Sequence, residues 1–257
     1  MTSTPHPADA GAPAVSDPEP SAVPAFRFQL PPEFHEIPLG IDVDEETLDA
    51  QMGAFARAYW GEREDLEPLR ALTAALYGVN SRQLAEDGAV HSAFGVFPIG
   101  GTADGAQPPE RISRCSLLVS VRELANPDPA LSAAGIAEML ARGRDGGEAV
   151  PVGLPAGPAV VHVAGSRSVW ERPEGEVETF AVRIELWMPF PDEDRLLLFC
   201  ISTTDVQDLY LYQAVLADIA DTITFAGDGA RDRDQSREDA LVMASATTPK
   251  APANPFG

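Results

Sequence analysis

The sequence is poor in the residue types that most often bind metals or carry out nucleophilic chemistry. It has two cysteines, Cys115 and Cys200, and four histidines, none close enough along the chain to form a metal-ligand motif. Each cysteine lies in an apolar pattern typical of a strand, which predicts a reduced thiol in the core. A disulfide between neighbouring strands would need an oxidising compartment. We therefore expect no metal site and no cofactor.

Long hydrophobic runs and lysine are also scarce. No apolar run approaches the roughly 20 residues that span a bilayer, and the N-terminus lacks the basic and apolar regions of a signal peptide. We therefore expect a cytoplasmic protein without a membrane span. Lys250 is the only lysine. With the abundance of alanine, glycine, proline, aspartate and glutamate, this indicates a GC-rich bacterial genome rather than a function.

Acidic side chains greatly outnumber basic ones. The formal charge of −22 comes from 18 basic and 40 acidic residues, and residues 26–226 hold 14 of the basic and 32 of the acidic ones. A surface this negative repels phosphate groups, which argues against binding to nucleic acid or anionic membranes and favours a basic partner protein. The simplest interpretation of the charge alone is solubility.

Both ends of the chain are poor in bulky apolar residues. Residues 1–25 and 227–257 cannot bury enough apolar surface to offset an ordering entropy of about 1–2 kcal/mol per residue. We therefore expect one α+β domain at residues 26–226 with a disordered tail at each end. A domain of that size is large enough for a single hydrophobic core.

Three apolar strands, predicted at 159–165, 177–188 and 195–203, and the amphipathic segment that follows them at 204–221 give the clearest structural signal. In the second of these strands Val182, Ile184 and Leu186 point one way, whereas the third strand is apolar on both faces. The third strand should therefore be central and covered on each side. A polar hairpin loop is predicted at 170–175. Strands are predicted at 26–30, 34–39, 90–99, 112–123, 159–165, 177–188 and 195–203.

Helical periodicity predicts helices at 42–60, 65–77, 129–142 and 204–221. Asp128 and Pro129 have the order of an N-cap and a first helical residue. Thr204 and Gln207 have the spacing of a capping box. Gly78 is expected to end the second helix, with a separate helical turn at 81–86. The buried face of that second helix is predicted to be a row of leucines, at Leu66, Leu69, Leu72 and Leu76.

The order of these elements points to a known fold. A first strand, a proline-linked extended piece and helices lead to an antiparallel meander, a last helix and the apolar end at 222–225. This order resembles the Mog1/PsbP-like α/β/α sandwich, which is also seen in small bacterial proteins of the LpqN type. The resemblance implies a mostly antiparallel sheet packed by helices and a non-catalytic binding or assembly role. It carries over no site residue.

The sequence contains no pattern of a known active site. There is no G-x-S-x-G motif for a serine nucleophile, and the glycines at 95–105 lack the lysine of a phosphate-binding loop. His35, His91 and His162 lie in segments predicted to be strands, where a structural role is the simpler interpretation. The sequence leaves open whether these three converge in space. We expect no catalytic residues.

Two tryptophans are candidates for an interaction surface. Trp187 lies opposite the apolar face of its predicted strand, beside Arg183 and Glu185. An exposed tryptophan flanked by charges is typical of a binding hot spot, although a helix on that side would bury it. Trp170, in the predicted hairpin loop, is the second candidate.

The leading hypothesis is a non-catalytic protein that binds another protein, through its sheet or through the acidic helical hairpin at 44–77. An immunity protein or export chaperone with a basic partner would fit this description. One alternative is a small-molecule or lipid-binding domain with its ligand between the sheet and the helices. The other is a hydrolase that uses two of the three strand histidines.

Overall fold

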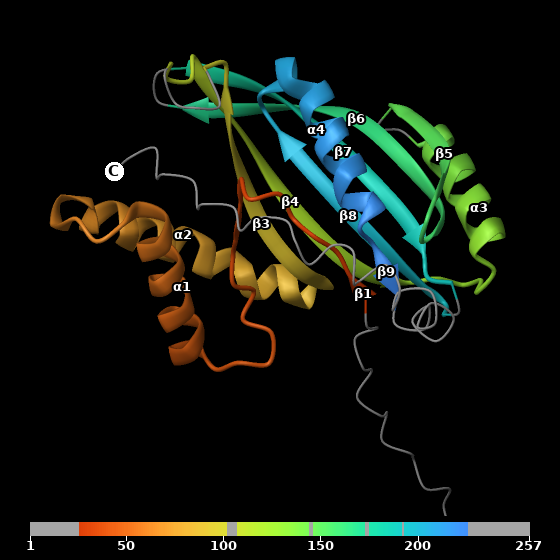
Figure 1. Cartoon of the computed structure of the whole chain (residues 1–257), viewed down its shortest axis with the longest axis horizontal. Helices are drawn as coiled ribbons and strands as arrows, with labels where there is room; N and C mark the ends of the chain where they lie inside the picture. The colour runs from red at the N-terminus through yellow and green to blue at the C-terminus, as the bar shows by residue number, and fades with distance from the viewer. Residues whose placement is uncertain (1–25, 102–106, 144–145, 173–174, 192, 226–257) are drawn as a thin grey trace, which may run out of the picture.

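A seven-stranded sheet is the centre of the fold (Figure 1). In this computed structural model the described residues are 26–101, 107–143, 146–172, 175–191 and 193–225. The predicted tails lie outside them. All neighbouring strands are antiparallel, in the order β2-β3-β4-β8-β7-β6-β5. The strands are β2 (Phe34–Glu36), β3 (Ala89–Ile99), β4 (Arg111–Glu123), β5 (Glu148–Leu154), β6 (Gly157–Arg172), β7 (Gly175–Pro189) and β8 (Arg195–Thr203).

The apolar faces of β7 and β8 form the core, as their alternation predicts. Leu186 faces Phe199 in the register between the two strands, and Ile184 faces Ile201. All four side chains are buried. β8 lies fourth of seven in the sheet, which confirms the prediction of a central strand.

Helix α4 (Leu209–Asp221) covers this core face, as Figure 1 shows. Tyr212, Leu216 and Ile219 are buried against the sheet. After α4 the short strand β9 (Thr224–Phe225) pairs with β1 (Phe26–Arg27), so the two ends of the described chain lie side by side. The first predicted strand is thus shorter than expected, because only Phe26 and Arg27 have a partner strand.

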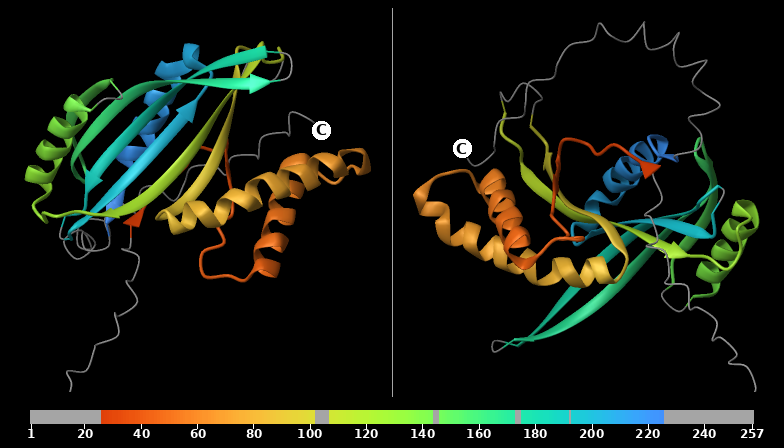
Figure 2. Two further views of the ribbon diagram at one scale, coloured as in Figure 1. Left: turned by 180° about the vertical axis from the view of Figure 1, so that it is seen from behind. Right: turned by 90° about the horizontal axis from the view of Figure 1, so that it is seen from below.

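The opposite face of the sheet carries two separate helical layers (Figure 2). Helix α3 (Pro129–Arg142) packs over β5, β6 and β7. Helices α1 (Glu45–Trp60) and α2 (Glu67–Glu86) form a hairpin that packs on β3 through Phe94. With α4 on the first face, the fold is an α+β sandwich of the predicted class. The resemblance to Mog1/PsbP-like proteins stays a prediction.

Local sequence sets the starts of α1 and α3 but not that of α4. Asp44 accepts a hydrogen bond from the Thr47 amide at 2.8 Å, and Asp128 caps α3 with Pro129 as its first residue, as predicted. The predicted capping box at Thr204 is wrong, because α4 begins only at Leu209, after a 3₁₀ turn. Asp205, just before that turn, accepts a hydrogen bond of 2.7 Å from the backbone amide of Arg114 in β4 instead.

Helix α2 is longer than predicted, because it does not end at Gly78. It continues through Gly78 to Glu86, so both the predicted stop and the separate turn at 81–86 are wrong. Gly78 has no positive φ, and a Cβ on it would lie 3.9 Å from Met52 of α1. The left-handed backbone that favours a helix end occurs instead at Gly88, where φ is 83°.

The hairpin of β6 and β7 also differs from the prediction. The two strands pair as far as Arg172 and Gly175, so Trp170 lies in β6 rather than in a loop. The neighbouring strand β5 was not predicted. The outer part of the hairpin is largely exposed and polar, at residues such as Ser166 and Ser168, and therefore lacks the apolar alternation that identifies a buried strand.

The core contact of β8 gives a direct stability test. Phe199→Ala should lower the free energy of unfolding by about 3–5 kcal/mol, because Phe199 is fully buried and its ring packs against Phe28 at 5.0 Å. The matched variant Phe180→Ala, on the exposed hairpin, should lower it by at most about 1 kcal/mol. Urea denaturation followed by circular dichroism measures both. Equal losses would contradict this location of the core.

Candidate functional site

A buried polar cluster joins β6 and β7. His162 faces Glu185 in the strand register, and Nδ1 of His162 lies 2.9 Å from Oε2 of Glu185. The same carboxylate oxygen accepts a hydrogen bond of 3.1 Å from Nε1 of Trp187. The guanidinium Nε of Arg183 lies 3.7 Å from the other oxygen. Glu185 therefore faces nitrogen atoms of three neighbouring side chains while only 6% of its surface is exposed.

Three of the four predicted surface residues belong to this cluster. Glu185 is buried, and Trp187 is half-buried because α3 packs over it. Arg183 retains partial exposure. The helix that the sequence left open is thus present, and it leaves the Glu185 carboxylate little surface for a partner. The side chain of Trp170 lies outside the described structure.

The His162–Glu185 pair resembles the imidazole–carboxylate pairs that orient catalytic bases. Such a base needs a nucleophile beside its other ring nitrogen. In this protein the neighbour of that nitrogen is Gly147, which has no side chain and so supplies no nucleophile; a Cβ on it would be 3.0 Å from Nε2 of His162. Burial raises the pKa of the Cys200 thiol, which faces Glu185 across the strand pair, so this thiol stays protonated at neutral pH. The geometry fits a structural cluster better than a catalytic one.

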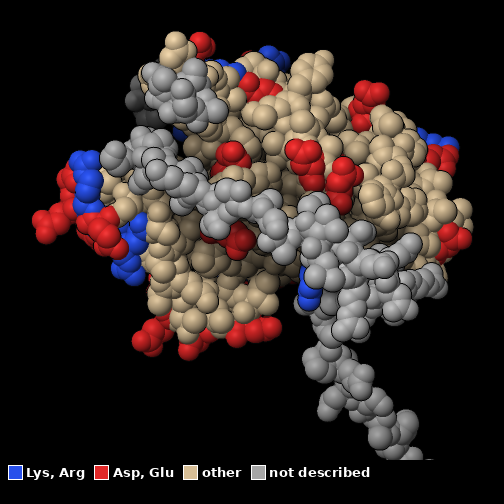
Figure 3. Space-filling model, in the orientation of Figure 1, with Lys and Arg blue, Asp and Glu red and all other residues tan. Residues whose placement is uncertain are grey.

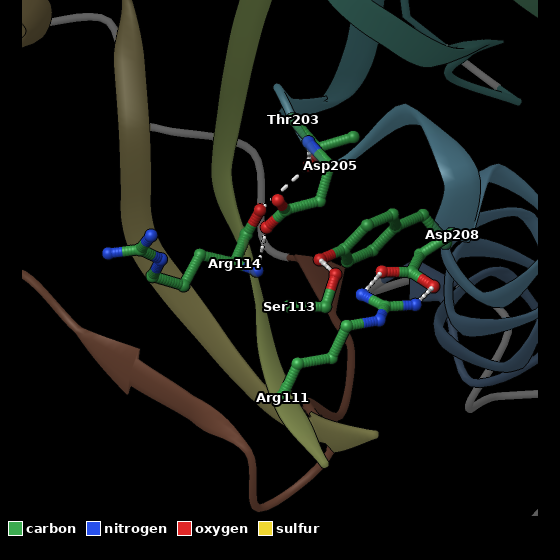
Figure 4. Close-up of polar contacts among 7 residues, drawn as sticks. Arg111, Ser113, Arg114, Thr203, Asp205 and Asp208 are labelled. Atoms are coloured by element: carbon green, nitrogen blue, oxygen red, sulfur yellow. Dashed lines mark hydrogen bonds and ion pairs between the residues drawn. The ribbon is translucent and has the colours of Figure 1, made fainter. Parts of the chain in front are cut away.

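A second polar cluster attaches the start of α4 to β4 (Figure 4). Arg111 makes a two-pronged ion pair with Asp208. Ser113 and Tyr212 share a buried hydrogen bond of 2.6 Å between their hydroxyl oxygens. The hydrogen bond to Arg111 lowers the pKa of Asp208. Burial raises the pKa of Tyr212 to about 12. These groups are engaged with one another, which indicates that they hold α4 on the sheet.

Two of the three strand histidines line one hollow. His35 and His91 border a cavity of about 810 Å³ between β2, the segment that follows it, and α1. The His35 ring stacks on Phe94 and meets Tyr59 edge-on, both at 5.1 Å between ring centres. Burial lowers the pKa of both histidines. His162 lies in β6 and does not line this hollow.

The hollow also contains Ser92 and Glu36, which are residue types that a hydrolase could use beside a histidine. Among the described residues, no hydrogen bond joins His35 or His91 to either of these side chains. Ser92 is buried, and within the described part of the chain no side chain makes the hydrogen bond to its hydroxyl that would activate it. In the same part of the chain, no group of three or more histidine, cysteine or acidic residues is arranged to bind a metal.

Helix α2 exposes a row of large apolar side chains. We call Leu69, Leu72, Leu76 and Val79 the α2 stripe; their exposed fractions are 39, 54, 58 and 79%. The prediction that the leucines form the buried face is therefore wrong. The face turned toward α1 and β3 carries Ala74 and Tyr77 instead.

The packing of α2 explains why its leucines face outward. Arg70, on the inner side, is buried and donates to the carbonyl oxygens of Gly61 and Arg63 at 2.6 and 2.9 Å, besides pairing with Glu67. This anchoring of the link between α1 and α2 sets the rotation of the helix. Periodicity alone shows that the leucines share a face but not which face packs.

The α1–α2 hairpin is also strongly acidic. Residues 42–87 contain 11 acidic and 4 basic side chains. In Figure 3 acidic groups crowd the lower tip of the molecule, where α1 begins, and acidic and basic groups mix at the left tip, where α1 joins α2. The α2 stripe therefore belongs to an element with a net negative charge.

Comparisons with known proteins do not place this chain in a family. No family model matches the sequence, and no curated protein matches it. Within the described residues, no helix is both long and apolar enough to cross a membrane.

The buried carboxylate of Glu185 can be tested by removal. Glu185→Ala should lower the free energy of unfolding by about 2–4 kcal/mol, because it leaves His162 and Trp187 without the carboxylate that they contact in a buried site. Glu138→Ala, which removes an exposed ion pair with Arg142, should change it by about 0.5 kcal/mol or less. Chemical denaturation measures both, and similar values would contradict the structural role of the cluster.

The ion pair of Asp208 predicts a pH dependence. Its pKa in the folded protein lies below the ordinary value of about 3.8, so the ion pair stabilises the fold fully above that value. The stabilisation is lost as the pH falls through the lower, folded pKa. Asp208→Asn should therefore destabilise the protein at pH 7 and progressively less below pH 3.8. Unfolding free energies of both proteins between about pH 2.5 and 7 test this, and a constant difference would disprove it.

Proposed function

We propose that this chain is a non-catalytic protein-binding module that docks a partner protein on the α2 stripe. The partner presents an amphipathic helix whose apolar row is flanked by lysine or arginine. The observation that carries the proposal is the row of four exposed apolar side chains on α2, with no described residue covering them.

The spacing of the α2 stripe suits a helical partner. Leu69, Leu72, Leu76 and Val79 follow one another at intervals of three and four residues, which places them in one line along the helix. A second helix laid along such a line would fill the spaces between these side chains. Full burial of a leucine or valine is worth about 1.5–3 kcal/mol, so a partner could gain substantially from this row.

The charge of the hairpin supports a basic partner. Residues 42–87 carry nearly three times as many acidic as basic side chains. A second copy of the chain would bring two such hairpins together and is disfavoured by like-charge repulsion, whereas lysines and arginines beside an apolar row would be attracted. The same charge disfavours nucleic acid. A cytoplasmic location and the binding role implied by the Mog1/PsbP-like resemblance belong to this proposal.

Two synthetic helical peptides with the same leucine row test the proposal, one flanked by lysines and the other by glutamates. The lysine peptide should bind the full chain, with an affinity that falls as salt increases. The double variant Leu72→Asp, Leu76→Asp should weaken this binding at least tenfold, which corresponds to about 1.4 kcal/mol. Fluorescence anisotropy of labelled peptides measures the dissociation constants.

A matched double variant on α3 is the control for this experiment. Leu131→Asp, Met139→Asp adds the same charges at two side chains that are also exposed, 59 and 54%. It should leave the affinity for the lysine peptide within twofold of wild type. Equal weakening by both variants, or tighter binding of the glutamate peptide, would contradict the proposal. A dimer in light scattering that only the α2 variant dissociates would show that a second copy is the partner.

A further inference from the structure

The hollow beside β2 is open to solvent, and the parts of its walls that can be contacted are mainly apolar. Its volume is about 810 Å³. On one wall Ile41 is 42% exposed, and on the other Ala54 and Ala58 of α1 are exposed. Small-molecule sites bury most of their ligand in a cleft or cavity. An open hollow with apolar walls suits a segment of polypeptide better.

Both ends of the described chain lie at this hollow. A second hollow of about 490 Å³ adjoins it, and the residues that line both are Glu36, Val90 and His91. Phe26, the first described residue, lines the smaller hollow and is opposite Phe225, the last one, in the pairing of β1 with β9 (Figure 1). The residues that follow Phe225 therefore start beside the smaller hollow, which adjoins the larger one.

Of the residues outside this domain, only those after 225 contain a run of large apolar side chains. Leu241, Val242 and Met243 are consecutive, whereas no other two large apolar residues are adjacent in residues 1–25 or 226–257. Residues 240–248 also contain no charged side chain. We call residues 240–244 the apolar tail segment. Its composition matches the walls of the larger hollow.

We propose that the apolar tail segment docks in the larger hollow of its own chain, with its three large side chains against Ile41 and the exposed alanines of α1. Residues 226–239 connect it to the domain. A flexible chain of about 15 residues spans roughly 20 Å on average and about 50 Å when extended, which is enough to reach an adjoining hollow. The site is separate from the α2 stripe, so this inference does not rest on the proposed function.

The covalent connection favours this occupant over a second molecule. A tethered segment has an effective concentration on the order of millimolar at its site, so a weak intrinsic affinity is sufficient for it to dock. A second copy or another protein would also lose translational and rotational freedom on binding. Two copies would in addition bring two acidic α1–α2 hairpins together, whereas a segment of the same chain does not.

The methionine side chains give a direct test in the full chain. The five methionines are at positions 1, 52, 139, 188 and 243. With ¹³C-labelled methionine methyl groups, the NMR signal lost in Met243→Leu belongs to Met243. It should differ from that of an exposed methionine, because the rings of His35 and Tyr59 line the hollow, and Ala54→Glu should return it to the exposed position. A Met243 signal at the exposed position in the wild-type chain would overturn the proposal.

A labelled peptide of residues 236–248 measures in a second way whether the hollow is filled. The wild-type chain should bind it weakly, because its own segment competes. Leu241→Asp, Met243→Asp in the chain should empty the hollow and tighten peptide binding at least about tenfold. Ala251→Asp, Ala253→Asp adds the same charges elsewhere after residue 225 and should change the dissociation constant by less than about twofold. Equal affinities of the wild-type chain and the first variant would contradict docking.

Two matched substitutions then locate the site in the chain with Leu241→Asp, Met243→Asp. Ala54→Glu should weaken peptide binding at least about tenfold, because it places a carboxylate in the apolar hollow while keeping a strong helix former. Ala134→Glu on α3 is also exposed but lines neither hollow, and it should change the affinity by less than about twofold.

The α2 stripe is the alternative location that this experiment must separate from the hollow. Leu72→Asp, Leu76→Asp, added to the same chain, should leave the affinity for the tail peptide within about twofold. If this variant weakens the peptide and Ala54→Glu does not, the segment binds the α2 stripe and the inferred location is wrong. The docking of the tail segment and the proposed function can therefore fail independently of each other.

Discussion

The contact between the central strands and α4 is the interaction on which the other elements depend. Phe199 of β8, Leu186 of β7 and Ile219 of α4 are each almost completely buried in one cluster. This cluster occupies one face of the sheet and holds its strands together. Helix α3 and the α1–α2 hairpin pack on the opposite face of the same sheet. The α1–α2 hairpin, which carries the proposed binding surface, therefore packs on a sheet that is stabilised mainly by the core on its other face.

The ionisable side chains that could take part in chemistry mostly pair with one another and stabilise the fold. Glu185 compensates His162 and Trp187 beneath α3, and Arg111 with Asp208 fixes the start of α4. Buried charges are tolerated only when such partners are present. This use of polar groups leaves two features that no other described element covers: the apolar stripe of α2, and the open hollow beside β2. The proposed function follows from the first of them.

The α1–α2 hairpin contributes to both features through different surfaces. Helix α1 provides Phe55 and Tyr59 to the hollow, whereas α2 turns its leucines away from α1. Phe94 of β3 lies between them, stacked on Tyr77 and on His35. One aromatic side chain thus positions the hairpin against the sheet and forms part of the surroundings of the hollow.

Local sequence by itself determined the elements whose signals depend on adjacent residues. The alternation in β7, the apolar run of β8 and the cap at Asp128 could be interpreted correctly, because period and capping act within a few positions. The exposed arms of the β6–β7 hairpin had no apolar alternation, so their length could not be recognised.

Only the tertiary structure decided which faces are covered. The α2 leucines share a face in any helix, yet the anchoring of Arg70 and the packing of Tyr77 turn that face outward. In the same way, the position of α3 covers Trp187, and the pairing of β2 with β3 brings His35 to the hollow that His91 lines. Burial of a face depends on a distant neighbour, and periodicity in one segment contains no information about that neighbour.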